Sequence, residues 1–242
     1  MIVVVANRHD QSAQDIVARW NNQGAAMLTC EDLSLSGWKY HIGHPENSAA
    51  VVDGQIVPQT AITGVLTRRP CIFEEELLHI HPADRTYVAS EMHAFLVSWL
   101  SSLTCPVLNC PTPTCLSGPY WRTEQWTMTA ARMGIPVRAA YRHISWHTTT
   151  ATTAATTSQS VEVESCKSEE IIEVTVVGER CIGNSDSTLV RQARQLATAA
   201  GVDLLSVRFN HRDGTFSGVN LWPDLTDDIT QAILELLQGK KV

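Results

Sequence analysis

The feature of this sequence that most constrains its fold is a run near the middle, residues 147–160, built almost wholly from Thr, Ala and Ser. Apolar residues do not recur in it at helical or strand spacing, and Thr is a weak helix former. The segments on either side do carry such spacing. The sequence therefore predicts two core-forming modules of different architecture, joined by a low-complexity linker.

The first module begins with a β-turn-α-β pattern. Residues 1–5 are apolar and mostly β-branched, which predicts a buried strand. Ser12 is a suitable N-cap for a helix over residues 13–22, Gly24 ends that helix, and residues 25–30 predict a second strand. Two strands joined through a helix are typical of an open α/β sheet, so we expect them to be parallel neighbours.

Periodicity and turn residues predict the remaining elements. In the first module these are strands over residues 38–42, 49–57, 63–66, 106–109 and 135–137, and helices over 84–103 and 120–133. In the second module they are strands over residues 171–177, 181–182, 204–209 and 216–221, and helices over 189–200 and from 227 or 228 to about 237. The second module is thus β-β-α-β-β-α, unlike the first.

Charge and hydropathy exclude several classes of protein. The chain of 242 residues has 18 Lys and Arg against 25 Asp and Glu, and a formal charge of −7 disfavours nucleic-acid binding. No apolar run reaches the roughly 20 residues of a spanning helix, and the N-terminus lacks the charged start of a signal peptide. We therefore expect no nucleic-acid partner, no membrane partner and a cytoplasmic location.

The cysteines and histidines do not form a recognisable metal motif. An odd number of cysteines, 7, in mostly apolar or strand-like settings favours free thiols over a disulfide framework. Cys105, Cys110 and Cys115 recur every five residues, unlike the CxxC spacing of zinc sites. His79 and His81 lack the i, i+4 spacing that would place them on one helix face, so they favour a polar loop.

Seven stretches of the chain stand in a characteristic order. They are residues 63–70 (TGVLTRRP), the predicted helix that contains Glu91, and residues 106–111 (PVLNCP), 130–137 (AARMGIPV), 174–183 (VTVVGERCIG), 196–207 (LATAAGVDLLSV) and 213–225 (DGTFSGVNLWPDL). In these stretches and their order the chain resembles the ATP-grasp ligases, in particular the peptide maturases of the microviridin type and the ribosomal-protein glutamate ligases. The resemblance implies an α/β fold, with an N-terminal preATP-grasp-like parallel sheet with helices and a reduced C-terminal ATP-grasp-like α+β subdomain.

The resemblance also implies a division into domains. Residues 1–110 correspond to the preATP-grasp-like domain, 111–144 to a connecting helix and strand, 145–168 to a linker replacing the family's central lid subdomain, and 169–242 to the C-terminal subdomain. In the family, the lid supplies a lysine and a glycine-rich loop over the ATP phosphates. Because no glycine occurs between His147 and Lys167, the resemblance implies that this half of the nucleotide site is missing.

Positions that hold Mg²⁺ in the family are also altered. Arg208 stands at about the position of an Asp ligand, Gly218 stands at that of a Glu ligand, and only Asn220 matches. Mg²⁺ prefers carboxylate oxygens and phosphates, and phosphoryl transfer depends on the metal. We therefore predict no catalytic residue, no metal ligand and no cofactor.

Five residues are candidates for ligand binding: Arg68, Arg69, Arg122, Arg208 and Asn220. Arg68 and Arg69 end a predicted strand, where open α/β sheets bind ligands, and could hold a peptide carboxylate; the alternative is a solvated strand end. Arg122 stands near the position of a phosphate-contacting lysine of the family and could pair with phosphate, or it is a surface residue.

These features predict a non-catalytic ATP-grasp-like protein that acts as a binding or scaffold subunit for a peptide, a protein or a small molecule. We predict that Trp126 fills the vacated nucleotide cleft, whereas Trp222 either fills it or joins an exposed partner-binding patch. Apolar surface left by the lost lid would also allow a homodimer. The alternative is a minimal ATP-dependent carboxylate–amine ligase, which would bind ATP and Mg²⁺ near Arg122 and Asn220.

Overall fold

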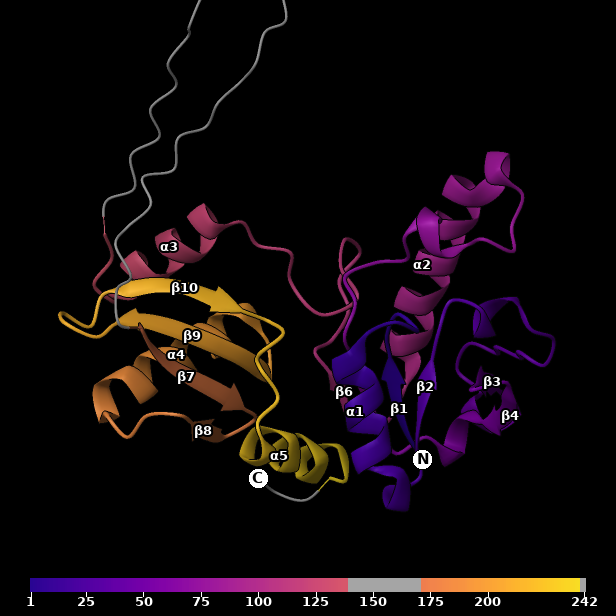
Figure 1. Ribbon diagram of the computed structural model, residues 1–242, viewed down its shortest axis with the longest axis horizontal. Helices are drawn as coiled ribbons and strands as arrows, with labels where there is room; N and C mark the ends of the chain where they lie inside the picture. Colours follow the sequence, from indigo (N-terminus) through magenta and orange to yellow (C-terminus); the bar gives the residue numbers. More distant parts are fainter. Residues whose placement is uncertain (139–170, 240–242) are drawn as a thin grey trace, which may run out of the picture.

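The computed structural model describes residues 1–138 and 171–239, and it contains two four-stranded sheets that lie side by side (Figure 1). The sequence-predicted linker over residues 145–168 lies outside the described residues. The N-terminal sheet is parallel and the C-terminal sheet is antiparallel. This mixed α/β architecture confirms the predicted fold class.

The N-terminal sheet has the strand order β2-β1-β5-β6. Its strands are β1 (Ile2–Val5), β2 (Ala25–Leu28), β5 (Gly64–Thr67) and β6 (Val107–Leu108), and its helices are α1 (Gln11–Arg19) and α2 (Arg85–Ser102). The predicted parallel pairing of the first two strands is confirmed, with Val4 beside Met27. Both faces of β1 are buried, because apolar residues alternate between a core under α2 and a core shared with α1.

Helix α1 starts earlier than predicted. Its N-cap is Asp10, whose Oδ1 accepts a hydrogen bond of 3.0 Å from the Ala13 amide, so the prediction of Ser12 as N-cap was wrong. Both residue types cap helices well, and the two candidates stand only two positions apart. Asp10 has a second partner, Arg68, whose guanidinium lies 3.1 Å from its other carboxylate oxygen. This tertiary contact favours Asp10.

The strand predicted over residues 38–42 is also wrong. Only a single bridge forms there, between Lys39 and Ala49, and the hairpin consists of β3 (Ala49–Val52) and β4 (Gln55–Pro58). The Trp38 ring packs edge-on against Phe95 and Trp99 of α2, with ring centroids 5.1 and 5.5 Å apart. Aromatic packing onto α2 thus takes the place of strand pairing for this segment.

The C-terminal module follows the predicted β-β-α-β-β-α order. Its elements are β7 (Ile171–Val177), β8 (Arg180–Ile182), α4 (Ser187–Ala200), β9 (Leu204–Asn210), β10 (Phe216–Asn220) and α5 (Asp227–Leu237). The sheet order is β10-β9-β7-β8. Helix α3 (Thr123–Arg132) joins α4 on one face of this sheet, where apolar side chains of β7 and β9 form a core (Figure 1).

Helix α5 and Asn109 both contribute contacts that hold the sheets together. Helix α5 buries Ile233 and Leu237 in one core with residues of β1, β5 and β6, and a Cβ on Gly64 would lie 2.6 Å from the Leu237 carbonyl oxygen. Asn109, which follows β6, accepts hydrogen bonds of 3.0 and 2.8 Å from the Asp203 and Leu204 amides and donates one of 2.9 Å to the Leu204 carbonyl. The C-terminal helix therefore covers the N-terminal sheet, and the boundaries at residues 110 and 169 stay predictions.

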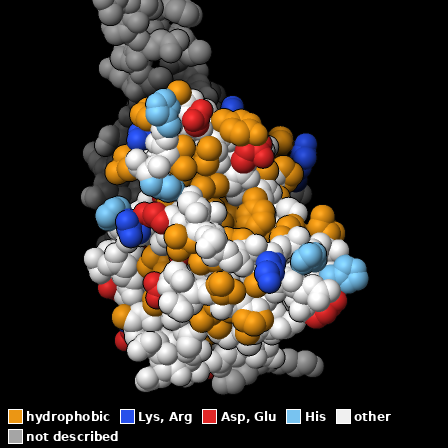
Figure 2. Space-filling view, turned by 90° about the vertical axis from the view of Figure 1, so that its right-hand side faces the viewer, with side chains coloured by type: hydrophobic (Ala, Val, Ile, Leu, Met, Phe, Trp, Pro, Cys, Tyr) orange, Lys and Arg blue, Asp and Glu red, His pale blue; other side chains and the backbone are white. Residues whose placement is uncertain are grey.

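The outer face of the N-terminal lobe is apolar in part. Figure 2 shows hydrophobic side chains spread over the side of the molecule on which α2 and the β3–β4 hairpin lie. Ile56 of β4 and Tyr87 of α2 are 63% and 68% exposed. Among the described residues, no helix combines the length and the apolar character needed to cross a bilayer.

Candidate functional site

The first place to look for a site is the carboxyl edge of the parallel sheet. The order β2-β1-β5 means that successive connections run in opposite directions from β1, so β1 and β5 flank the switch point at which open α/β sheets bind ligands. The segments that leave these strands carry Arg8, Asp10, Arg68 and Arg69. The predicted arginine pair therefore does lie at the edge where a ligand site is expected.

Arg68 is already engaged by the protein. Its Nε donates to Asp10 Oδ2 at 3.1 Å, and its side chain is only 13% exposed. Its amide donates to the Val5 carbonyl at 2.9 Å. The ion pair therefore ties the end of β5 to the start of α1, and a ligand carboxylate would have to compete with Asp10 for the guanidinium.

Arg69 is more deeply held. Its side chain is 3% exposed, Nη2 lies 2.6 Å from Glu76 Oε1, and Nε donates to the Cys71 carbonyl at 2.9 Å. Glu76 belongs to the short 3₁₀ helix Glu74–Glu76. A guanidinium with these partners has little capacity left for a ligand, because Glu76 occupies the position that a ligand carboxylate would take.

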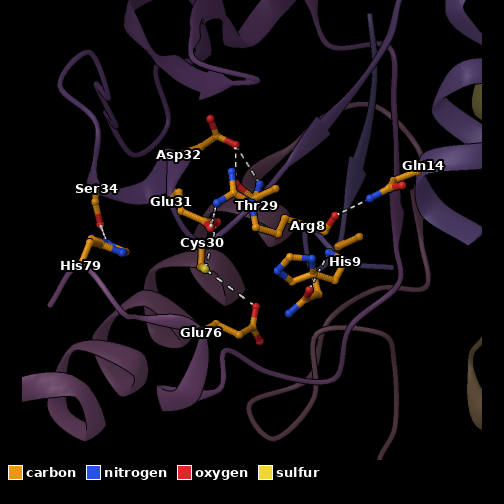
Figure 3. Close-up of polar contacts among 12 residues, drawn as sticks. Arg8, His9, Gln14, Thr29, Cys30, Glu31, Asp32, Ser34, Glu76 and His79 are labelled. Carbon is orange, nitrogen blue, oxygen red and sulfur yellow. Dashed lines mark hydrogen bonds and ion pairs between the residues drawn. The ribbon is translucent and has the colours of Figure 1, made fainter. Parts of the chain in front are cut away.

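A polar cluster extends from Glu76 to the end of β2 (Figure 3). Cys30 Sγ lies 3.3 Å from Glu31 Oε2 and 3.8 Å from Glu76 Oε2, and Arg8 Nη1 lies 3.0 Å from Glu31 Oε1. Burial, followed by its hydrogen bond with Glu31, raises the pKa of Cys30 to about 12. The thiol is therefore protonated near neutral pH and is no nucleophile, since the thiolate is the reactive form.

Beside this cluster lies an open cavity of about 680 Å³, between α1, β2 and the turn of the β3–β4 hairpin. Its buried carboxylate, Asp32, is saturated by the protein: Oδ2 accepts from the Thr29 amide at 2.8 Å, and Oδ1 accepts from the Gly54 amide at 2.8 Å. Sequence reasoning missed this cavity, because its polar residues are spread along the chain without a common motif. Its walls are organised to hold the hairpin against β2.

The second place to look is the C-terminal sheet, on the face opposite α3 and α4. Arg208 of β9 stands directly across from Gly218 of β10 and from Glu173 of β7. A Cβ on Gly218 would lie 3.6 Å from Arg208 Nη2. The two positions at which the resemblance implies carboxylate ligands are thus cross-strand neighbours, and the guanidinium covers the space beside Gly218.

Arg208 itself is exposed, and its guanidinium forms no hydrogen bond or ion pair with the residues that the structure describes. Gly218 has φ +157°, a backbone conformation that L side chains rarely adopt, so a glutamate there would be strained. The local backbone conformation therefore favours the glycine found at position 218 over a glutamate.

Asn220 lies on the same face, across from Ser206. Its side chain is used locally: Nδ2 donates to the Trp222 carbonyl at 2.8 Å, and Oδ1 accepts from the Trp222 amide at 2.9 Å. Asn220 thus shapes the loop that leads to α5. The Nε1 of Trp222 is buried and donates to no described residue.

Arg122 and Trp126 lie in another layer. Arg122 is exposed at the start of α3, where its amide donates to Gln125 Oε1 at 2.8 Å. Trp126 is buried in the core between α3, α4 and the sheet, with the Trp121 ring centroid 4.6 Å from its own. The prediction that Trp126 fills the cleft was therefore wrong, because Trp126 packs on the sheet face opposite Arg208.

The five predicted residues thus divide among three locations. Arg208 and Asn220 share one sheet face, Arg68 and Arg69 lie at the edge of the other sheet, and Arg122 starts a helix in the opposite layer. Within residues 1–138 and 171–239, no group of three or more His, Cys, Asp or Glu side chains is arranged to hold a metal ion.

Comparison with known proteins bears on the fold. No family model and no curated protein matches the sequence. Among solved structures, the macrocyclase MdnC bound with precursor peptide MdnA, from Microcystis aeruginosa MRC, matches with a TM-score of 0.65 and 12% identity, over 98% of this chain and 99% of that one.

Two further structures give similar values. The macrocyclase MdnB from the same organism has a TM-score of 0.63 and 14% identity, over 98% of both chains. The ATP-grasp ligase PsnB, complexed with minimal precursor, Mg and ADP, has a TM-score of 0.61 and 13% identity, again over 98% of both chains. Likeness at this identity establishes the fold, and the chain therefore has the fold of ATP-grasp peptide ligases.

Proposed function

We propose that this chain is a non-catalytic ATP-grasp-like protein that acts as a binding or scaffold subunit for a peptide, a protein or a small molecule. The observation that carries the proposal is the pair formed by Arg208 and Gly218. At the two positions where the resemblance implies metal-binding carboxylates, the chain has a glycine and, beside it, an arginine whose guanidinium has no partner among the described residues.

The electrostatics of this pair disfavour a cation. Relative to two carboxylates, Arg208 and Gly218 remove two negative charges and add a positive one. A Mg²⁺ ion at this face would be repelled by Arg208, and no described cluster of acidic side chains would compensate. A carboxylate or phosphate of a partner would instead be attracted, because a guanidinium forms two parallel hydrogen bonds with such groups.

A peptide is the partner class that the comparisons favour. MdnC was solved with its precursor peptide, and PsnB was solved with a minimal precursor. An acidic peptide would supply a partner for the guanidinium of Arg208, which has none within the described part of the chain. The apolar outer face of α2 and the β3–β4 hairpin offers a separate surface for a second copy of the chain, and we propose that the protein works in the cytoplasm.

Calorimetry with ATP, in the presence and absence of Mg²⁺, tests the non-catalytic part of the proposal. We expect no saturable heat and no thermal stabilisation with millimolar nucleotide. Arg208→Asp, which returns a carboxylate to the sheet face, serves as the matched variant. Mg²⁺-dependent binding of ATP to the wild-type protein would overturn the proposal.

A second candidate function is a minimal ATP-dependent carboxylate–amine ligase. The likeness to PsnB with Mg and ADP is the observation that favours it. This function requires ATP binding that weakens in Arg122→Ala and Asn220→Ala, and ADP release when a carboxylate and an amine are both supplied. Binding of an acidic peptide without ATP, lost in Arg208→Ala, would favour the scaffold instead.

A further inference from the structure

The outer edge of the parallel sheet is formed by β2, which comes first in the strand order β2-β1-β5-β6. The Leu28 carbonyl of β2 accepts a hydrogen bond of 3.2 Å from the Ala6 amide, at the end of β1. Alternate residues of a parallel strand direct their backbone groups to opposite sides. The backbone groups of Ala25, Met27 and Thr29 therefore point away from β1.

Only the carboxyl half of this outer side is satisfied within the chain. The Met27 carbonyl accepts a hydrogen bond of 3.1 Å from the Asp53 amide, and the Thr29 amide donates one of 2.8 Å to Asp32 Oδ2. The Ala25 carbonyl and the Met27 amide have no partner in the part of the chain that the structure describes. An acceptor followed by a donor two residues later is the pattern to which one residue of an added parallel strand bonds.

The open cavity of about 680 Å³ between α1 and β2 lies against this part of the edge. Met27 lines it, together with Val17 and Ala18 of α1. Val17 is half-buried and Ala18 is exposed, so the two form an apolar wall that is open to solvent. Successive side chains of a strand leave opposite faces, so an added strand would place every second side chain toward this wall.

The charged residues around the cavity are mostly acidic. Glu31, Asp32 and Asp53 line it, against Arg8. Arg8 Nη1 already lies 3.0 Å from Glu31 Oε1, as Figure 3 shows. The carboxylate of Asp53 is exposed at the hairpin turn and has no ion-pair partner among the described residues. The wall therefore attracts a positively charged side chain.

We propose that the outer edge of β2 is a docking site for an extended basic peptide, which adds to the sheet as a strand parallel to β2. One peptide residue donates its amide to the Ala25 carbonyl and accepts from the Met27 amide. The peptide runs parallel because an antiparallel partner would also need the Met27 carbonyl, which Asp53 occupies. Its apolar side chain packs on α1, and a flanking lysine pairs with Asp53. The site lies in the other lobe from Arg208 and does not depend on the function proposed above.

Amide hydrogen exchange of the full chain, followed by NMR, tests the proposal with the peptide Ac-Lys-Thr-Val-Thr-Lys-NH2. In the free protein the Met27 amide should exchange faster than the Leu28 amide, which faces β1. We expect the peptide to slow exchange at Met27 saturably. The same peptide with an N-methylated valine keeps its side chains but lacks the donor for the Ala25 carbonyl. It should bind about tenfold more weakly, the effect of one lost hydrogen bond.

Variants locate the peptide on the cavity wall. Ala18→Lys adds a positive charge to the wall and should weaken binding, whereas Ser12→Lys adds the same charge to α1 outside the cavity and should not. Asp53→Asn should also weaken binding, and Arg208→Ala should leave it unchanged. Equal affinity for the two peptides, or exchange at Met27 that millimolar peptide does not slow, would overturn the proposal.

Discussion

The two lobes use the same residue types in opposite ways. At the edge of the parallel sheet, Arg69 is buried and paired with Glu76, and Asn109 is bonded across to the other lobe. On the face of the antiparallel sheet, Arg208 is exposed and Asn220 bonds only within its own loop. Arginine and asparagine thus bond across elements in the first region, whereas in the second Arg208 has no bonded partner in residues 1–138 and 171–239.

The comparison teaches that an arginine at a strand end is not by itself evidence of a ligand site. Arg68, Arg69 and Arg208 are equally plausible as anion-binding residues in the sequence. They differ in whether a carboxylate pairs with the guanidinium: Arg68 and Arg69 each form an ion pair, whereas Arg208 forms none with the described residues, although Glu173 stands across from it. A guanidinium that already has an internal partner contributes to stability, whereas one without a partner is available for recognition.

The largest expected effect comes from Arg69→Ala. This change leaves Glu76 partly buried and unpaired, which typically costs about 3–5 kcal/mol in the free energy of unfolding. Urea denaturation of the wild type and the variant measures it. If the variant lost less than about 1 kcal/mol of unfolding free energy, the Arg69–Glu76 pair would contribute no more than an exposed ion pair does. The contrast between a structural Arg69 and an exposed Arg208 would then fail.

Asn109→Ala should have the next largest effect. The variant loses three hydrogen bonds between the lobes and leaves the buried amide and carbonyl of Leu204 without these partners, which we expect to cost about 2–3 kcal/mol. Asn220→Ala is the matched control and should lose about 1 kcal/mol, since its bonds are local and partly exposed. Equal losses in thermal unfolding would contradict the distinction between the two asparagines.

Cys30 should make stability fall at high pH. Its folded-state pKa of about 12 exceeds the ordinary value of 9.0, so the folded protein binds the proton more tightly than the unfolded chain. The stabilisation is full below pH 9 and is lost as pH rises toward 12, by about 1 kcal/mol between pH 9 and pH 10. Cys30→Ala should lose less stability than the wild type when urea unfolding is compared at the two pH values; part of the dependence should remain, because burial also raises the pKa values of Cys71, Cys105 and Cys115.

The smallest effect on stability is expected for Arg208→Ala. The side chain is exposed and has no partner among the described residues, so the free energy of unfolding should change by less than about 0.5 kcal/mol. Binding of an acidic peptide, measured by calorimetry at low salt, should nevertheless weaken. If Arg208→Ala lost stability but retained peptide binding, Arg208 would stabilise the fold, as Arg69 does, and would not bind the peptide.

Local patterns predicted most elements of the fold. The parallel pair β1 and β2 and the whole β-β-α-β-β-α order follow from apolar runs and turn residues that act over a few positions. The failures came where distant groups competed. The cap of α1 is Asp10 and not the predicted Ser12, and Asp10 is also bound by Arg68. The segment predicted as a strand around Trp38 instead packs its Trp38 ring on α2.

The same division holds for the candidate sites. The turn at residues 211–214 pairs Phe216 with Phe209, and a register shift between Phe216 and Gly218 then brings Gly218, instead of Ser217, opposite Arg208. The sequence by itself determined that no carboxylate stands at either position. It could not determine that Glu76 would reach Arg69 or that Trp126 would face away from Arg208. Only the tertiary structure decided these contacts, because each depends on how separately formed elements pack and on which charged groups that packing removes from water.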